Sequence, residues 1–241
     1  MNRRNLIKTM GSLGVLSSVA GCTDFFYTPD DSPEVSLYGD RELSISGTVS
    51  EGSQPHLLIG DADAPYKVHY FTDPQCSFCF RWDNTRLPEV FEKHIQTGEV
   101  AMYFRPIGFF NWNRYSDYVS TIAYTLYDKD VTQSQFLRWY TQITTAIQSE
   151  DSVDDINMIS ELRNAGVESD VIQEVRRIPT DGPDIPTDIV EENMSTAQNV
   201  GFTGTPFFVF VESDSDLTDD ITMTGFQPNS EFDARIDELK S

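Results

Sequence analysis

The sequence predicts an α/β protein with a central mixed β-sheet, helices on its faces and a helical insertion. A strand, a helix and a second strand follow one another between residues 66 and 105, and such a unit implies a parallel pair with a right-handed crossover. Helical patterns fill residues 107–186. Beyond them, residues 207–224 have the strand character of an antiparallel hairpin. One sheet with both parallel and antiparallel pairs is therefore expected.

Residues 1–22 are predicted to be an export signal rather than part of the fold. Arg3 and Arg4 form a twin-arginine pattern, and the apolar run that follows is too short for an ordinary membrane span. The run ends in Val19-Ala-Gly-Cys22, which resembles the lipobox of exported lipoproteins, whose cysteine receives lipid. We therefore expect export by the twin-arginine route and a lipid anchor on Cys22 at the outer face of the cell membrane. The alternative for Cys22 is a lone buried cysteine.

The segment after the signal is predicted to be a flexible tether, because its prolines, aspartates and serines offer little apolar surface to bury. It would let the folded part stand off the membrane. The predicted divisions are the signal at 1–22, the tether at 23–40, the sheet domain at 41–106 and 187–241, and the helical insertion at 107–186.

The first strands lead to a pair of cysteines. Residues 43–49 alternate enough for a short strand, and residues 57–65 are interpreted as an approach loop. Residues 66–71 are aromatic and β-branched, which favours a buried strand. Asp73 and Pro74 then suit a turn and the start of a helix, since aspartate can cap exposed amides and proline needs no hydrogen bond there.

The crossover of the strand-helix-strand unit is expected to be a broken helix. Residues 79–86 contain no glycine or proline, but Pro88 lacks an N–H and clashes with the preceding turn, so a kink or restart is predicted there. Residues 89–96 continue as helix, and Gly98 is a plausible stop. Residues 100–105 form the second strand, which ends at a proline.

The remaining elements are predicted from apolar stripes, capping residues and turn signals. The stripes are assigned to the core and to no chemistry. Helices are expected at 118–126, 136–147, 153–165 and 169–178, a turn-rich return at 180–187, a helix at 188–200, strands at 207–211 and 221–224, and a closing helix at 230–240.

The chain is strongly acidic. Its formal net charge is −22 at pH 7, and loss of the signal would remove three cations, Arg3, Arg4 and Lys8. Nucleic acid and anionic membrane surfaces are therefore not expected as partners, because phosphate binding needs clustered lysine and arginine. The acids are spread along the chain, a pattern typical of halophilic surfaces, on which counterions screen self-repulsion. The alternative is an ordinary acidic mesophilic protein.

Cys76 and Cys79 are the candidate catalytic residues. Cys76 falls near a helix N-terminus, where unpaired N–H groups stabilise a thiolate, and Cys79 lies one turn further in, where it can resolve a mixed disulfide. Zinc would need four ligands, but Cys22 is the sole other cysteine and the three histidines show no ligand spacing. A structural disulfide would close too small a loop to restrict the unfolded chain much. Redox chemistry without a metal or cofactor is therefore favoured.

The chain resembles the DsbA-like thiol-disulfide oxidoreductases of the thioredoxin superfamily. A strand leading into Cys-x-x-Cys, a helical insertion, and Gly201-Phe-Thr-Gly-Thr205-Pro206 before a hairpin carry this resemblance, which covers roughly residues 59–239. It implies a thioredoxin-like fold, an attacking thiolate at Cys76, a resolving thiol at Cys79, and a cis-proline loop at Thr205 and Pro206 that binds extended client chains. Several relatives carry a buried acid where Tyr70 stands, so the proton acceptor for Cys79 stays open.

The expected function is an exported, lipid-anchored enzyme that exchanges disulfides with protein cysteines. Oxidase or isomerase activity is favoured, because export places the pair where disulfides persist. The alternatives are a dedicated reductase for one client, such as a cytochrome-maturation protein, or a non-catalytic peptide-binding module. The expected partners are client proteins with cysteines, an unknown redox partner and, through the lipid, a membrane.

Overall fold

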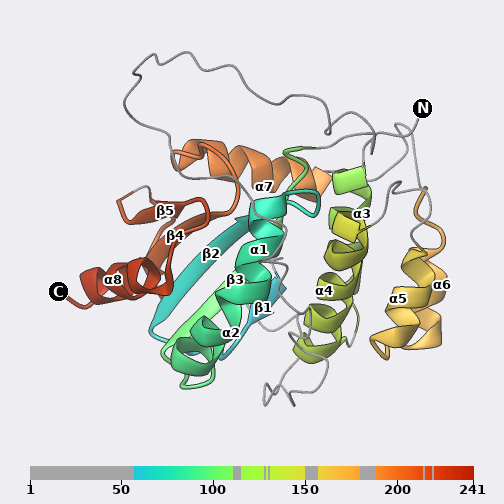
Figure 1. Cartoon of the computed structure of the whole chain (residues 1–241), viewed down its shortest axis with the longest axis horizontal. Helices are drawn as coiled ribbons and strands as arrows, with labels where there is room; N and C mark the ends of the chain where they lie inside the picture. The colour runs from blue at the N-terminus through green and yellow to red at the C-terminus, as the bar shows by residue number, and fades with distance from the viewer. Residues whose placement is uncertain are drawn as a thin grey trace, which may run out of the picture. The chain divides into compact units, whose positions relative to one another are not determined.

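The computed structural model describes residues 57–110, 115–127, 129, 131–149, 157–179, 188–213, 215–218 and 220–241 (Figure 1). Several predicted features lie outside these residues. They are the signal at 1–22 with its twin arginines and Cys22, the tether at 23–40, the short strand at 43–49 and the return at 180–187.

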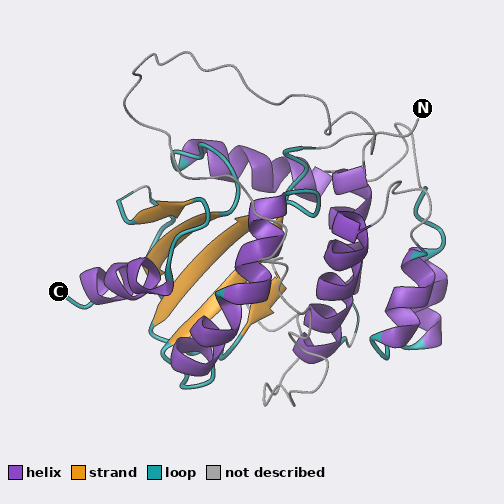
Figure 2. Ribbon diagram, in the orientation of Figure 1, coloured by secondary structure: helices purple, strands orange, loops and turns teal. Residues whose placement is uncertain are grey.

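A mixed sheet lies at the centre of the described fold (Figure 2). Its order is β1-β3-β2-β4-β5, in which β2 and β3 are parallel and the other neighbours are antiparallel. β2 and β3 are buried on both faces, as is usual for parallel strands covered by helices. The mixed sheet and the parallel strand-helix-strand unit that the sequence predicts are thus present. The strands are β1 (Leu57–Ile59), β2 (Tyr66–Thr72), β3 (Val100–Pro106), β4 (Phe207–Glu212) and β5 (Thr222–Thr224).

The interpretation of residues 57–65 as an approach loop is wrong for its first part. Leu57–Ile59 is strand β1, which pairs antiparallel with β3 at the edge of the sheet. Its residues are all buried, so a run this short shows no alternation that would distinguish a strand from a loop. At Gly60, φ is +105°, and a Cβ there would lie 3.1 Å from the Val100 carbonyl oxygen. A glycine is therefore needed where the chain leaves this edge strand.

Helices α1 (Ser77–Thr85), α2 (Leu87–Val90) and the π-helix η3 (Phe91–Ile95) cross one face of the sheet (Figure 1). The helix breaks at Arg86 and restarts with Pro88 in the first turn of α2, as predicted. The π-helical turn has no signal in the apolar pattern. α8 (Asn229–Leu239) packs on the same face, where the rings of Trp82, Phe208 and Phe232 meet.

The opposite face of the sheet is covered by α7 (Asp188–Asn199). Phe71 of β2 and Val209 of β4 form an apolar cluster with Ala197 of this helix. Side chains alternate across the sheet, so Tyr70 faces Trp82 of α1 while its neighbour Phe71 faces α7. Helices on both faces leave the sheet as the middle layer of the fold.

The described insertion helices follow β3 and bury apolar side chains, and the first of them is buried along most of its length. Figure 1 shows α4 lying between α1 and the α5–α6 pair, and ring contacts of Phe104 with Phe136 and Tyr140 join α4 to the sheet. No helix of the described residues is both long enough and apolar enough to span a membrane. The bounds are α3 (Tyr115–Tyr127), α4 (Gln133–Ser149), α5 (Met158–Asn164) and α6 (Ser169–Val175).

Candidate active site

Cys76 occupies the N-cap of α1, where the sequence predicts a helix start. Its backbone is extended, with φ −78° and ψ 114°, and its Sγ accepts a hydrogen bond from the Cys79 N–H at 3.3 Å. The sulfur thus takes the place of the oxygen that usually caps a helix. The exposed fractions are 2% for Cys76 and 1% for Cys79, and neither cysteine is in a disulfide.

The pKa values of the two thiols are shifted in opposite directions. A hydrogen bond from the Cys79 side chain, followed by the interaction with Thr205 and the backbone N–H groups of Cys79 and Phe78, lowers the pKa of Cys76 to about 7 against the opposing effect of burial. Burial, followed by the interaction with Cys76, raises the pKa of Cys79 well above its ordinary value. The geometry therefore favours a thiolate at Cys76 and a thiol at Cys79.

The loop that carries Thr205 and Pro206 lies against the first cysteine. The Thr205-Pro206 peptide bond is cis, as the resemblance implies. The Cys76 Sγ lies 3.5 Å from the Thr205 carbonyl oxygen, and the Pro206 carbonyl accepts a 2.7 Å hydrogen bond from the Gly225 N–H. β4 begins at the next residue beside β2, so the sheet holds this loop next to the N-terminus of α1.

Asp83 is a site residue that the sequence analysis missed. It is 3% exposed, lies one turn beyond Cys79 on α1, and accepts a 2.7 Å hydrogen bond from the Tyr70 hydroxyl through Oδ1. Its Oδ2 has no hydrogen-bond partner among the described residues. The four-residue spacing from Cys79 was a usable signal, because residues i and i+4 share one face of a helix.

The buried carboxyl and its neighbours favour protonated forms. Burial raises the pKa of Asp83 well above its ordinary value, while the hydrogen bond from Tyr70 partly opposes this rise. Burial and then the Asp83 charge raise the pKa of both Tyr70 and Tyr140, and the same charge adds to the rise at Cys79. Burial thus gives Asp83 a higher proton affinity than an exposed carboxyl, and it lies one helical turn from the Cys79 thiol.

Asp73 does more than the turn role expected from the sequence. Its Oδ1 accepts hydrogen bonds from the Gln75 N–H at 2.7 Å and the Ser116 hydroxyl at 2.8 Å. Its Oδ2 accepts the Phe110 N–H at 2.9 Å. Burial raises the pKa of Asp73 to about 6, although these hydrogen bonds oppose the rise. The carboxylate thus joins the cysteine loop to the chain that enters the insertion.

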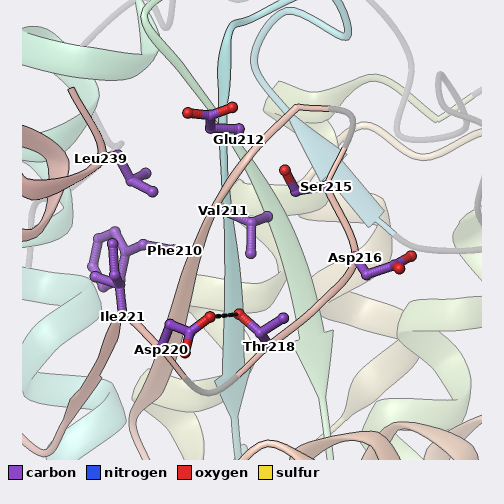
Figure 3. A pocket seen from close by; sticks show the side chains of 9 residues that line it. All are labelled: Phe210, Val211, Glu212, Ser215, Asp216, Thr218, Asp220, Ile221 and Leu239. Carbon is purple, nitrogen blue, oxygen red and sulfur yellow. Dashed lines mark hydrogen bonds between the residues drawn. The ribbon is translucent and has the colours of Figure 1, made fainter. Parts of the chain in front are cut away.

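A cavity of about 260 Å³ lies elsewhere, under the β4–β5 loop and beside α8 (Figure 3). Glu212, Asp216 and Asp220 give it acidic groups, while Val211 and Leu239 supply apolar ones. In the sheet register Glu212 pairs with Tyr66, at the end of β2 remote from the cysteines. This cavity is therefore no part of the candidate active site.

Within the described ranges, no group of three or more histidine, cysteine, aspartate or glutamate side chains is arranged to hold a metal ion. His94 illustrates why its carboxylate neighbours make no such site. Its Nδ1 lies 2.6 Å from Glu99 and its Nε2 lies 2.8 Å from Asp233, so both ring nitrogens are already engaged.

Comparisons with known proteins agree with this geometry. A sequence model of the family described as thioredoxin matches residues 52–220. A probable disulfide bond formation protein D from Bacillus anthracis is 36% identical over 85 residues, which are 35% of this chain and 37% of that protein. A protein of the same description from Bacillus cereus is 35% identical over 85 residues. The matched part thus spans just over a third of these curated relatives.

Solved structures resemble the fold at low sequence identity. The crystal structure of α-DsbA1 from Wolbachia pipientis has a TM-score of 0.57 at 20% identity, over 76% of this chain and 89% of that one. Oxidised BdbD from Bacillus subtilis has a TM-score of 0.57 at 15% identity, over 78% and 94%. The family match covers well over half of the chain. With a cysteine pair at a helix N-terminus and a cis-proline loop beside it, this protein belongs to the thioredoxin family and has the fold of its DsbA-like members.

Proposed function

We propose that this protein is a thiol-disulfide oxidoreductase that acts on protein cysteines. The observation that carries the proposal is the placement of Cys76 at the α1 N-terminus, against the cis-proline loop, with its pKa lowered to about 7 while that of Cys79 is raised. A thiolate of this kind is both a nucleophile and a good leaving group in disulfide exchange. The names of the Bacillus relatives point to the same chemistry.

In the oxidising direction the reaction begins with a Cys76–Cys79 disulfide. A client thiolate attacks the Cys76 Sγ, which forms a mixed disulfide, and the Cys79 sulfur leaves with the electron pair of the broken bond. A second client thiolate then attacks the client sulfur of the mixed disulfide, and Cys76 leaves as a thiolate. The client gains a disulfide and loses two electrons, while the protein gains them and passes them to a redox partner.

Asp83 is proposed to supply and accept the proton of Cys79. Burial raises the pKa of Asp83 and so favours its protonated form, which can pass a proton to the sulfur inside the core when Cys79 leaves as a thiolate. On the return step Asp83 takes the proton back as Cys79 attacks. The Tyr70 hydroxyl donates a hydrogen bond to Oδ1, whereas Oδ2 has no hydrogen-bond partner among the described residues and is the oxygen proposed to exchange the proton.

The activity is tested with a reduced, unfolded client in a glutathione redox buffer at high salt. The wild-type protein should speed disulfide formation in the client, and Cys79→Ala should accumulate a mixed disulfide through Cys76, because the resolving thiol is missing. Cys76→Ser is the control that should abolish both effects. Client oxidation at the uncatalysed rate with wild-type protein would reject the proposed activity.

The direction of exchange is proposed to be oxidation or isomerisation rather than reduction. The lowered pKa of Cys76 supports this direction above neutral pH, where the ionised thiol stabilises the reduced protein and makes its disulfide a stronger oxidant. The test is the equilibrium reduction potential of the pair. A value close to that of thioredoxin, about −270 mV, would instead favour the dedicated reductase.

We also propose that the domain is exported by the twin-arginine route and held at the outer face of the membrane through lipid on Cys22. The twin arginines and the Val19-Ala-Gly-Cys22 pattern support this address. Cys22→Ser should move the protein from the membrane fraction to the soluble fraction, whereas Arg3→Lys with Arg4→Lys should block export. Retention of the Cys22→Ser protein on membranes would rule out the lipid anchor.

A further inference from the structure

Asp73 lies where the cysteine loop and the start of the insertion meet. Its side chain accepts the Gln75 N–H within its own loop, and the Phe110 N–H and Ser116 hydroxyl from the chain beyond β3. The exposed fraction of Asp73 is 1%, so these donors replace water around a buried carboxylate. A buried charge with this many donors holds its partners in a narrow set of positions.

The segment held by Asp73 carries an exposed aromatic ring. Phe109 is 44% exposed, one of two large apolar side chains in the described residues with such exposure. Its ring centroid lies 5.1 Å from that of Phe202, in an edge-to-face arrangement. Phe202 in turn lies 5.6 Å from Phe207, the residue that follows the cis-proline. A line of rings therefore runs from the entrance of the insertion to the proposed client-binding loop.

We propose, on the basis of the exchange activity proposed above, that Asp73 is a positioning residue for client recognition. By holding the Phe110 amide and the Ser116 hydroxyl, it fixes the exposed Phe109 ring beside the cis-proline loop. Phe109 then binds an aromatic side chain close to the client cysteine. The clients that this site favours are therefore protein segments with an aromatic residue adjacent to the reacting cysteine.

The carboxylate form of Asp73 suits this role. The pKa of Asp73, raised by burial to about 6, still leaves the side chain ionised at neutral pH. An asparagine there can keep one oxygen acceptor, but its NH₂ group meets an N–H or O–H donor at the other position. Asp73→Asn therefore removes part of the hold on the insertion with little change in side-chain volume.

The test compares client peptides that differ in one side chain next to their cysteine, phenylalanine in one and serine in the other. An aromatic contact at Phe109 should give the wild-type protein a kcat/KM preference of about 3- to 10-fold for the phenylalanine peptide. Phe109→Ala and Asp73→Asn should each lose most of this preference through a higher KM. The double variant should lose no more than either single variant, because Asp73 acts through Phe109.

Gln133→Ala is the matched control. Gln133 is fully buried and also ties the insertion to the sheet domain, through hydrogen bonds with the Gly60 N–H at 2.9 Å and the Gly60 carbonyl at 3.2 Å. Gly60 packs near Val100, at the end of β3 remote from the cysteines. If a general loosening of the insertion were the cause, Gln133→Ala would also lower the preference for the phenylalanine peptide. The proposal requires Gln133→Ala to keep this preference.

The proposal is overturned if Asp73→Asn keeps the wild-type preference for the phenylalanine peptide. It is also overturned if the double variant loses more of this preference than Phe109→Ala alone. The pH midpoint of Cys76 alkylation in Asp73→Asn should match the wild type, and a shifted midpoint would show an effect on the thiolate instead. If Asp73→Asn fails to fold, Ser116→Ala and its double variant with Phe109→Ala are interpreted in the same way. Exchange with both peptides at equal kcat/KM would reject the recognition proposal alone, whereas exchange with neither would reject the proposed activity as well.

Discussion

The stabilisation of the Cys76 thiolate can be tested by removing the hydrogen-bond donor that lowers its pKa most. The largest lowering effect on the pKa of Cys76 is the hydrogen bond from the Cys79 side chain. Cys79→Ala removes this donor, whereas Cys79→Ser replaces it with a hydroxyl. Hydrogen bonds to charged groups contribute about 1.5–3 kcal/mol, and one pKa unit corresponds to about 1.36 kcal/mol, so the alanine variant should raise the pKa by about one to two units.

The lowered pKa of Cys76 also determines how fast this cysteine reacts in the wild-type protein. With a pKa of about 7 instead of the ordinary 9, about half of Cys76 is thiolate at pH 7, compared with about 1%. Intrinsic nucleophilicity falls with the pKa, by about 8-fold for two units. Relative to an equally accessible ordinary cysteine, Cys76 should therefore react about 6-fold faster at pH 7.

The effect of the lowered Cys76 pKa on the reduction potential of the cysteine pair depends on pH. A lowered thiol pKa stabilises the reduced protein fully above about pH 9, by about 3 kcal/mol, and this stabilisation is lost as the pH falls through 7. At pH 7 less than about 1 kcal/mol remains, because only half of the thiol is ionised. This stabilisation raises the reduction potential of the pair by about 60 mV at high pH and by about 10 mV at pH 7.

The assay is the rate of iodoacetamide labelling between pH 5 and pH 10, with mass spectrometry to identify the labelled cysteine. Labelling of the wild-type protein should begin at Cys76 and have its midpoint near pH 7. The midpoint should lie higher in Cys79→Ala than in Cys79→Ser. A wild-type midpoint above pH 8.5, first labelling at Cys79, or equal midpoints in the two variants would refute the reasoning.

Further predictions concern proton transfer, stability and salt. Asp83→Asn can keep the hydrogen bond from Tyr70 but should slow resolution of the mixed disulfide by about 100-fold, as measured by rapid-quench kinetics; an unchanged rate would exclude Asp83 as the acid and base. Because the pKa of Asp73 is raised to about 6 in the folded protein, its contribution to the free energy of unfolding should fall by about 2 kcal/mol as the pH rises from 4 to 7. Urea titrations of wild type and Asp73→Asn should show this as a pH-dependent difference. His94→Phe removes the contacts of the buried imidazole nitrogens with Glu99 and Asp233 and should cost about 1–3 kcal/mol by the same method, more than Lys93→Ala at the surface. The net charge of −22 predicts a melting temperature that rises with KCl concentration, and indifference to salt would argue against a halophilic surface.

The local features of the site could be predicted from the sequence alone. Residues 66–71 have the composition of a buried strand, and the turn signals after them place Cys76 at the start of a helix. Pro88 similarly marks the helix restart. These predictions hold because strand propensity, capping and the missing proline N–H act within a few residues of the chain. The cis-proline loop was predicted by resemblance, from Thr205-Pro206 ahead of a hairpin.

Tertiary structure decided the features that depend on distant partners. β1 is a strand because β3 pairs with it, which three apolar residues do not reveal. Asp83 becomes a candidate proton donor and acceptor because packing buries it one turn from Cys79 and brings it the hydroxyl of Tyr70 from β2. Asp73 is a simple turn residue in the sequence, but Phe110 and Ser116 reach its carboxylate from the chain that follows β3. Proton affinity and buried hydrogen bonds depend on desolvation by the whole fold, so residue order alone does not specify them.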